Sequence, residues 1–239
     1  MLIKKITAII LTIALASSAL CACGKNADTQ TTSASYTGTV PPEITASTSL
    51  TPGSIKYVED KDSHIENAIR IQRFNLNYVE LTVGDKYMDN DGKIYTVTAV
   101  GVSTGHPVYA SGNSLLITLK IIGGNTRRIG ATAFQGCSSL SNVYIGEGVK
   151  TIGDYAFYLC PKLSVLSLPD TLTEIGAAAF SRAAVKELVI PQSVVKIGVA
   201  AFSNCPNLTK VTLPSRFNDA QTLKSIFADI DGIEFIFVD

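Results

Sequence analysis

The sequence predicts an α/β solenoid, in which a ladder of short parallel strands is backed by short helical turns. Two repeated patterns predict this fold. The phrase Ile-Gly-x-x-Ala-Phe begins at residues 129, 152, 175 and 197, and a second pattern, apolar-x-x-apolar-x-apolar, falls between its copies. A unit of about 23 residues is too short to bury its own apolar side chains, whereas stacked copies share one continuous core.

The second pattern predicts the strands, because its last three positions alternate as in a pleated chain. Its copies are Leu140-Val143-Ile145, Leu163-Leu166-Leu168, Val185-Leu188-Ile190, Leu208-Val211-Leu213 and Ile230-Ile233-Phe235. The first pattern, extended to Ile-Gly-x-x-Ala-Phe-x-x-Cys, places apolar residues at i, i+4, i+5 and i+8. That spacing is typical of one face of a helical turn.

Together these motifs resemble the BspA-like leucine-rich repeats of bacterial cell-surface proteins. The stretch IGDYAFYLCPKLSVLSLPDTLTEIGAAAF and its flanking copies carry the resemblance, which covers residues 115–239. It implies a short leucine-rich-repeat array that acts as a non-enzymatic adhesion or binding module for an extracellular protein or glycan, including one derived from a host. The alternative is a structural or envelope-assembly role within the same bacterium.

Both ends of the array depart from the pattern. Near residues 117–122, Lys120 occupies a position where we expect an inward apolar residue, so this segment is predicted to be an edge strand or a cap. After residue 214 the strand pattern persists but Ile-Gly-x-x-Ala-Phe is lost, as is common in terminal repeats.

Three cysteines follow the period of the core, since Cys137, Cys160 and Cys205 each lie three residues after a repeat Phe. A small buried hydrophobic residue suits such a position, so packing is the favoured interpretation. In the third repeat Ala183 or Arg182 fills the equivalent position, and in the last repeat Phe227 does. An exported chain could instead join Cys137 to Cys160 by a disulfide.

The N-terminus resembles a bacterial lipoprotein signal peptide over residues 1–22. Two lysines precede an apolar stretch at residues 6–15, and Leu20 and Ala22 lead to Cys23. The resemblance implies that Cys23 is lipidated and that the chain is exported to the extracellular face of the cell membrane, which it contacts through the lipid anchor only. The alternative is an ordinary signal peptide.

Residues 23–54 are rich in Ser, Thr and Pro and are predicted to form a disordered tether. Residues 55–114 are predicted to form a β-rich N-terminal cap region. It includes a hairpin with arms near 79–87 and 93–100 around the turn at residues 89–92. Residues 65–71 fit either a short helix or part of a strand.

Candidate chemistry is sparse. The chain has 20 basic and 20 acidic residues, so its net charge does not predict nucleic-acid binding. Neither His64 nor His106 has metal ligands at a suitable spacing, and the Asp89-x-Asp91-Gly92 trio lacks the remaining ligands of an EF-hand loop. We therefore predict no enzyme activity, no metal site and no cofactor.

The remaining candidates are the residues that the strands turn outward. In an alternating strand these side chains form an open face, on which aromatic and apolar residues are reasonable contact points. The predicted ligand-binding face consists of Asn142, Tyr144, Val165, Ser167, Glu187, Val189, Lys210 and Thr212. A solvated face with no partner is the alternative.

Overall fold

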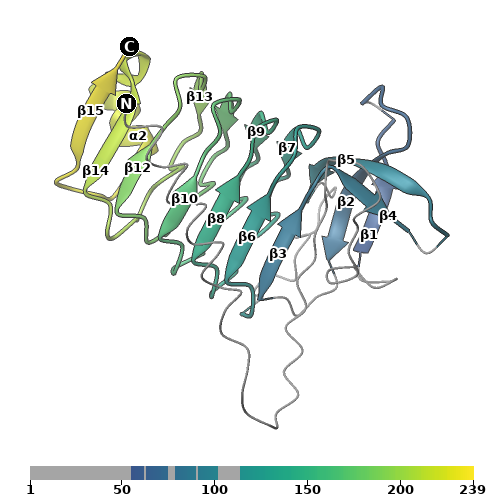
Figure 1. Ribbon diagram of the computed structural model, residues 1–239. Coiled ribbons are helices and arrows are strands. Elements are labelled where there is room, and N and C mark those ends of the chain that lie inside the picture. The colour runs from purple at the N-terminus through teal and green to yellow at the C-terminus, as the bar shows by residue number, and fades with distance from the viewer. Residues whose placement is uncertain (1–54, 62, 75–78, 90, 102–113) are drawn as a thin grey trace, which may run out of the picture. The chain divides into compact units, whose positions relative to one another are not determined.

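Each repeat contributes one short strand to each of two parallel ladders, which stand side by side in Figure 1. The structure is a computed structural model that describes residues 55–61, 63–74, 79–89, 91–101 and 114–239. All of these residues belong to one unit of the chain, residues 31–239. The predicted signal peptide, Cys23 and the predicted tether lie outside the described residues.

The front ladder is built by the leucine-rich pattern. Its strands, in order, are β3 (Glu80–Val83), β6 (Thr118–Ile121), β8 (Asn142–Ile145), β10 (Val165–Ser167), β12 (Glu187–Val189), β14 (Lys210–Pro214) and β15 (Glu234–Val238). From β3 to β10 and from β12 to β15, neighbouring strands pair in parallel at equal positions, so that Leu119, Val143 and Leu166 lie at one level. Inward residues therefore stack on inward residues, as the periodicity predicts.

The back ladder is built by the Ile-Gly motif, which forms two-residue strands. These are β7 (Arg128–Ile129), β9 (Thr151–Ile152), β11 (Glu174–Ile175) and β13 (Lys196–Ile197). They continue a sheet that contains β1 (Ile55–Glu59), β2 (Ala68–Phe74), β4 (Lys86–Met88) and β5 (Ile94–Val100). The fold is therefore a β-solenoid with two ladders.

The predicted helical turns do not form. After each Ile-Gly the backbone is left-handed at two positions that lie four residues apart, and a left-handed residue interrupts an α-helix. The first position is Thr132, Tyr155, Ala178 or Ala200, and the second is Gly136, Leu159, Arg182 or Asn204, with φ between 50° and 71°. Helix in the described chain is limited to η1 (Ser215–Phe217) and α2 (Ala220–Ile226).

Backbone hydrogen bonds explain why the turn takes this form. Alternate N–H groups donate to the carbonyl oxygens of the next turn, as from Phe134 to Ala156 at 2.7 Å and from Phe157 to Ala179 at 2.8 Å. A helix would consume those donors within the turn. The repeated turn instead uses them to join neighbouring repeats, which satisfies the buried backbone.

The repeat phenylalanines form a column through the core. Phe134, Phe157, Phe180 and Phe202 are fully buried, and successive ring centroids are 5.3, 5.1 and 5.3 Å apart with nearly parallel planes. Stacked rings contribute about 0.5–1.5 kcal/mol per pair beyond the burial of their area. The column therefore links the stability of each turn to that of its neighbours.

The repeat glycine is required by a close approach between turns. A Cβ on Gly176 would lie 2.5 Å from the Asp154 nitrogen and from the Gly153 carbonyl carbon of the preceding turn. A Cβ added to Gly153 or to Gly198 would likewise lie 2.5 or 2.4 Å from the backbone of the turn before it. The glycine of the Ile-Gly motif is therefore required by the short distance between stacked backbones.

The N-terminal end of the array differs from the expectation based on Lys120. The buried residues of β6 are Leu119 and Ile121, while Lys120 points outward, level with Tyr144 and beside Glu80, with which it forms an ion pair. The inward pattern of this rung is Leu116-x-x-Leu119-x-Ile121, so the expected register was wrong. The edge of the front ladder is β3, which pairs with β6.

The region before the repeats is joined to both ladders. The β1–β2 pair is antiparallel, β2 and β7 flank β5 in parallel, and residues 68–71, left open between helix and strand, lie in β2. An antiparallel β4–β5 pair flanks the turn at Asp89, but the segment before it belongs to β3 of the front ladder. The buried Asp85 accepts hydrogen bonds from the backbone of Gly124 and Asn125, which ties this region to the first repeat.

At the C-terminal end a helix replaces the lost motif. Asp219 caps α2 by accepting a hydrogen bond from the Thr222 nitrogen. The carbonyl oxygens of Ser225 and Ile226 at the end of α2, and of Ala228 just after it, accept the hydrogen bonds that a further turn would accept. Phe227 stacks on Phe202 at 5.8 Å. It therefore extends the phenylalanine column, and its expected place in the cysteine position was wrong.

The shortened third repeat interrupts the front ladder. Ala183 is fully buried and takes the position of the cysteine, whereas Arg182 is exposed and left-handed like Leu159, so the missing residue falls after Ala183. The strand pairings run from β3 to β10 and from β12 to β15, with none between β10 and β12. The back ladder runs on through the same repeat without a break.

The three described cysteines are free thiols buried in the core. Cys160 donates to the Phe134 carbonyl at 3.3 Å and Cys205 donates to the Phe180 carbonyl at 3.4 Å. A hydrogen bond with Cys160 and burial raise the pKa of Cys137, and burial raises the pKa of Cys205 to about 11. The Cys137–Cys160 disulfide is not formed in this structure.

The glycine close approach predicts a large difference between two Gly→Ala variants. Gly176→Ala forces two backbones apart, and we expect it to lower the free energy of unfolding by about 2 kcal/mol or more. Gly124→Ala is the control, because nothing lies within 4 Å of its added Cβ, and a change below about 0.5 kcal/mol is expected. Urea denaturation followed by circular dichroism measures both, and equal effects would contradict the close approach.

Burial of the three thiols, together with the raised pKa of Cys205, predicts that the core cysteines resist alkylation. At pH 8 the Cys205 thiol lies about three pH units below its pKa, so about one molecule in a thousand carries a thiolate. We expect peptide mapping after N-ethylmaleimide treatment to show Cys137, Cys160 and Cys205 unmodified in the folded chain. All three should react fully in urea, and Cys205 in the folded chain should become reactive only as the pH approaches 11. Fast modification at pH 8 would contradict the buried arrangement.

Candidate interaction surfaces

The eight residues of the predicted face all lie on the outer side of the front ladder, which we call the front face. Asn142 stands beside Val165, and Tyr144 beside Ser167, because β8 pairs with β10. Glu187 and Val189 likewise stand beside Lys210 and Thr212 on the next pair of strands. The interruption between β10 and β12 divides the eight residues into two groups of four.

The front face combines exposed apolar residues with charges. Val165 is 41% and Val189 is 65% exposed, whereas the inward Val143 and Val211 are completely buried. The amide of Asn142 donates to the Thr118 hydroxyl at 3.2 Å, so it is held by its own ladder. Exposed valines next to Glu187 and Lys210 make a surface on which a partner could gain both apolar and polar contacts.

A second surface lies at the N-terminal end of the back ladder. A pocket of about 450 Å³ is lined there by Arg127, Arg128, Lys150 and Thr151 of the repeats and by Asp60 and Ile65 from the connection between β1 and β2. Arg127, Arg128 and Lys150 are all exposed. We call this hollow the basic pocket.

The acidic residue of the basic pocket is already engaged. The Asp60 carboxylate accepts a hydrogen bond from the Thr98 hydroxyl and lies 3.6 Å from Nε of Arg70. Within the described chain, the ion pairs are Asp60–Arg70, Glu80–Lys120 and Glu174–Lys196. The positive charges of Arg127, Arg128 and Lys150 are therefore not compensated by a described carboxylate.

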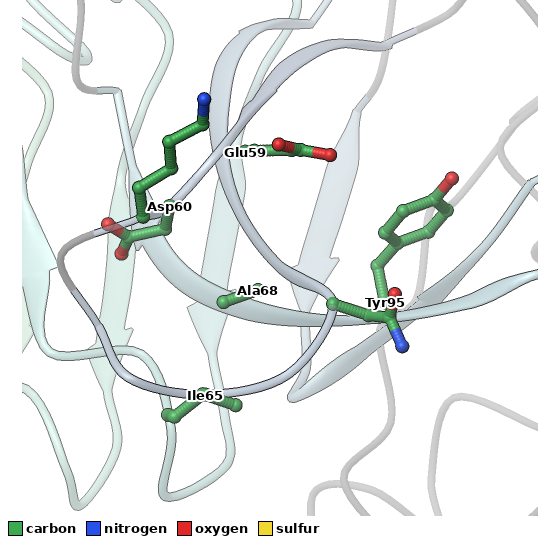
Figure 2. A pocket seen from close by; sticks show the side chains of 7 residues that line it. Glu59, Asp60, Ile65, Ala68 and Tyr95 are labelled. Atoms are coloured by element: carbon green, nitrogen blue, oxygen red, sulfur yellow. The ribbon is translucent and has the colours of Figure 1, made fainter.

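A smaller pocket is also lined by part of the β1–β2 connection, and it shares Asp60 and Ile65 with the basic pocket. It encloses about 210 Å³ and is also lined by Glu59 and Tyr95 (Figure 2). In Figure 2 the Asp60 side chain points away from Glu59 and Tyr95. Since Asp60 is held elsewhere, these two carboxylates do not form a pair that could exchange protons with one ligand.

Three tyrosines pack together next to this smaller pocket. The ring centroid of Tyr95 lies 5.2 Å from that of Tyr57 and 6.2 Å from that of Tyr87. The Tyr95 hydroxyl donates to Asp89 at 3.0 Å, and Lys93 lies 5.0 Å from the ring centroid. A hydrogen bond with Tyr57, burial and the Asp89 carboxylate raise the pKa of Tyr95. The cluster fastens the β4–β5 turn to β1, and the raised pKa of Tyr95 keeps its phenol protonated at neutral pH.

The sequence reasoning missed the basic pocket. Its signal was present, because two adjacent repeats carry basic residues at or before the Ile-Gly motif, in NTRRIG and GVKTIG. The wall formed by Asp60 and Ile65 could not be placed, since it belongs to a segment without repeat periodicity.

Neither a metal-binding cluster nor a membrane-spanning helix is found among the described residues. In that part of the chain no three His, Cys, Asp or Glu side chains come together in a group that could hold a metal ion. None of its helices is long and apolar enough to cross a membrane.

Solved structures resemble this chain. A leucine-rich-repeat protein of T. pallidum is 26% identical and superposes with a TM-score of 0.59 over 70% of this chain and 72% of its own. A leucine-rich-repeat protein of Bacteroides ovatus is 24% identical with the same TM-score, over 79% of this chain and 53% of its own. The chain therefore matches about half the length of the Bacteroides protein, and that likeness concerns the fold.

No sequence among curated proteins matches the chain. The family model of the BspA type leucine-rich repeat region matches residues 109–234 in six copies. This range contains the four Ile-Gly motifs and the strands from β6 to β14 of the two ladders. The chain belongs to the BspA-type leucine-rich-repeat family.

Proposed function

We propose that this chain is an exported surface lipoprotein whose repeat array binds an extracellular protein or glycan through the front face. Family membership supports a repeat-based interaction module of the kind that is typically non-enzymatic. The observation that carries the proposal is the exposure of Val165 and Val189 on an open ladder, flanked by Tyr144, Glu187 and Lys210. Apolar side chains at this exposure are stabilised when a partner removes them from water.

The front face is small, which favours a weak or multivalent interaction. Seven strands spaced about 4.8 Å apart give a ladder of roughly 30 Å. An interface on such a surface would bury an area at the lower end of the range for stable complexes. Many copies of the chain on one cell would raise the overall avidity. Display on a tether of residues 23–54 would let several copies engage one large ligand.

Attachment through Cys23 is the membrane part of the proposal. Two acyl chains on Cys23 would hold the array outside the cell without a spanning helix, because stable anchoring takes more than one chain. Residues 1–22 would then be removed as the signal peptide, so that Cys23 becomes the first residue of the mature chain.

The anchor is tested by metabolic labelling with an alkyne fatty acid in a bacterial host. We expect the chain to incorporate the label, the Cys23→Ala variant to lose it, and the Cys21→Ala variant to retain it. Cys21 is the matched control because it lies two residues away in the same segment. An unlabelled parent chain, or loss of the label with Cys21→Ala alone, would refute attachment through Cys23.

The front face is tested with the full-length chain, purified in mild detergent and immobilised. The bait is exposed to host extracellular-matrix extract and, separately, to envelope extract of the bacterium. The test variant is Tyr144→Ala/Glu187→Ala/Lys210→Ala. The control, Tyr155→Ala/Glu174→Ala/Lys196→Ala, changes the same residue types away from the front face, in the turn after β9 and on the back ladder. We expect capture from host extract to fall at least about tenfold with the test variant and to persist with the control.

Two outcomes would contradict adhesion through the front face. Equal capture by the test and control variants would place any ligand elsewhere on the chain. Capture from the bacterial envelope alone would instead favour the structural or envelope-assembly role.

A further inference from the structure

We propose that the basic pocket on the back ladder binds an anionic polysaccharide. This inference does not rest on the front-face proposal, because the pocket is lined by β5, β7 and β9 and by the β1–β2 connection. None of the eight residues of the front face lines it. The two surfaces can therefore be tested separately.

The basic pocket concentrates positive charge. Arg127, Arg128 and Lys150 bring three positive charges to one pocket in a chain that has no net charge. Asp60, the one acidic residue among the described residues of the lining, already contacts Thr98 and Arg70. Attraction to an anion is thus a property of this pocket, whereas a uniformly basic protein would attract polyanions everywhere.

The cations of the basic pocket are spread over two successive turns. Arg128 and Thr151 are paired across β7 and β9, and the Lys150 nitrogen donates to the Arg127 carbonyl, so the charges sit on two successive turns. Parallel strands are about 4.8 Å apart, which spreads the cations along the ladder. A compact ion needs converging donors, whereas a chain with several anionic groups can meet each turn in succession.

The lining favours a sugar chain over an acidic peptide. The strands β5, β7 and β9 are interior strands of their sheet, paired on both edges, so no backbone edge is open for an added peptide strand. Recognition must use side chains, and here they are guanidinium and ammonium groups, the hydroxyl of Thr151 and the exposed Ile65. Hydroxyl-rich rings that carry acidic groups complement this set. The volume of about 450 Å³ lies within the usual range of pockets for small ligands and ligand segments.

Hydrogen bonds restrain the walls of the basic pocket. Arg127 donates to the Gly148 carbonyl at 3.5 Å, which restrains its guanidinium beside the next turn. On the opposite side, Ser63 donates to the Asp60 carbonyl at 2.9 Å and so holds the β1–β2 connection. The charged groups are therefore partly fixed before a ligand arrives, which reduces the entropy lost on binding.

The test measures heparin binding to the full-length chain in detergent, by titration calorimetry at several salt concentrations. The pocket variant is Arg127→Gln/Arg128→Gln/Lys150→Gln. The matched control is Lys162→Gln/Lys186→Gln/Lys224→Gln, which removes the same charge from exposed positions that do not line the pocket. Polyglutamate is the comparison ligand, because it presents carboxylates on a peptide backbone.

We expect the parent chain and the control variant to bind heparin with affinities within about twofold of one another. The pocket variant should bind at least about tenfold more weakly, and the slope of log affinity against log salt should fall by about two to three, one for each lost ion contact. Polyglutamate should bind at least tenfold more weakly than heparin to the parent chain.

Three outcomes would overturn the proposal: no heparin binding, an equal loss in the pocket and control variants, or polyglutamate binding as tight as heparin. The melting temperature of each variant shows whether it is folded. If the triple variant does not fold, Arg128→Gln and Lys150→Gln are tested singly, since both side chains are exposed and neither carries a described ion pair. Loss of binding in neither single variant would also overturn it.

Discussion

Hydrogen bonds between the backbones of successive turns set the distance at which every other part of the array must pack. They run from Phe134 to Ala156 and from Phe157 to Ala179, and bring the phenylalanine rings to centroid distances of 5.1–5.3 Å. At this spacing no side-chain atom fits at Gly176, where a Cβ would lie 2.5 Å from the preceding backbone. Glycine, phenylalanine and the small buried thiol are thus three consequences of one spacing.

This constraint explains how much of the fold the sequence could predict. The parallel strands of the front ladder were predictable because inward residues stack on inward residues, so the core repeats in the sequence. The turns were not, since Tyr155 and Leu159 are left-handed although neither is a residue that favours that conformation. A spacing of i, i+4, i+5 and i+8 is the same for a helical turn and for this pair of turns. Only the destination of the backbone N–H groups distinguishes them.

The two candidate surfaces differ in how far the sequence could predict them. The front face could be assigned from sequence, because outward positions follow directly from the inward ones in an alternating strand. The basic pocket needs two segments about 65 residues apart, and one of them, around Asp60, has no periodicity that would place it. Lys120 shows the limit at the array edge: its neighbours Leu119 and Ile121 carry the inward pattern, but a single charged residue was enough to shift the expected register.

Stacking restricts which residues can occupy the interior positions of each turn, whereas the outward positions can differ from one turn to the next. The residue just before each Ile-Gly motif is Arg128, Thr151, Glu174 or Lys196. The side-chain charge at this position therefore changes sign along the back ladder, while the isoleucines that follow stay in register. The third repeat even loses a residue and its front pairing without disturbing the back ladder. Because each turn depends on its neighbours alone, the front face and the basic pocket can acquire different ligands without a change in the core.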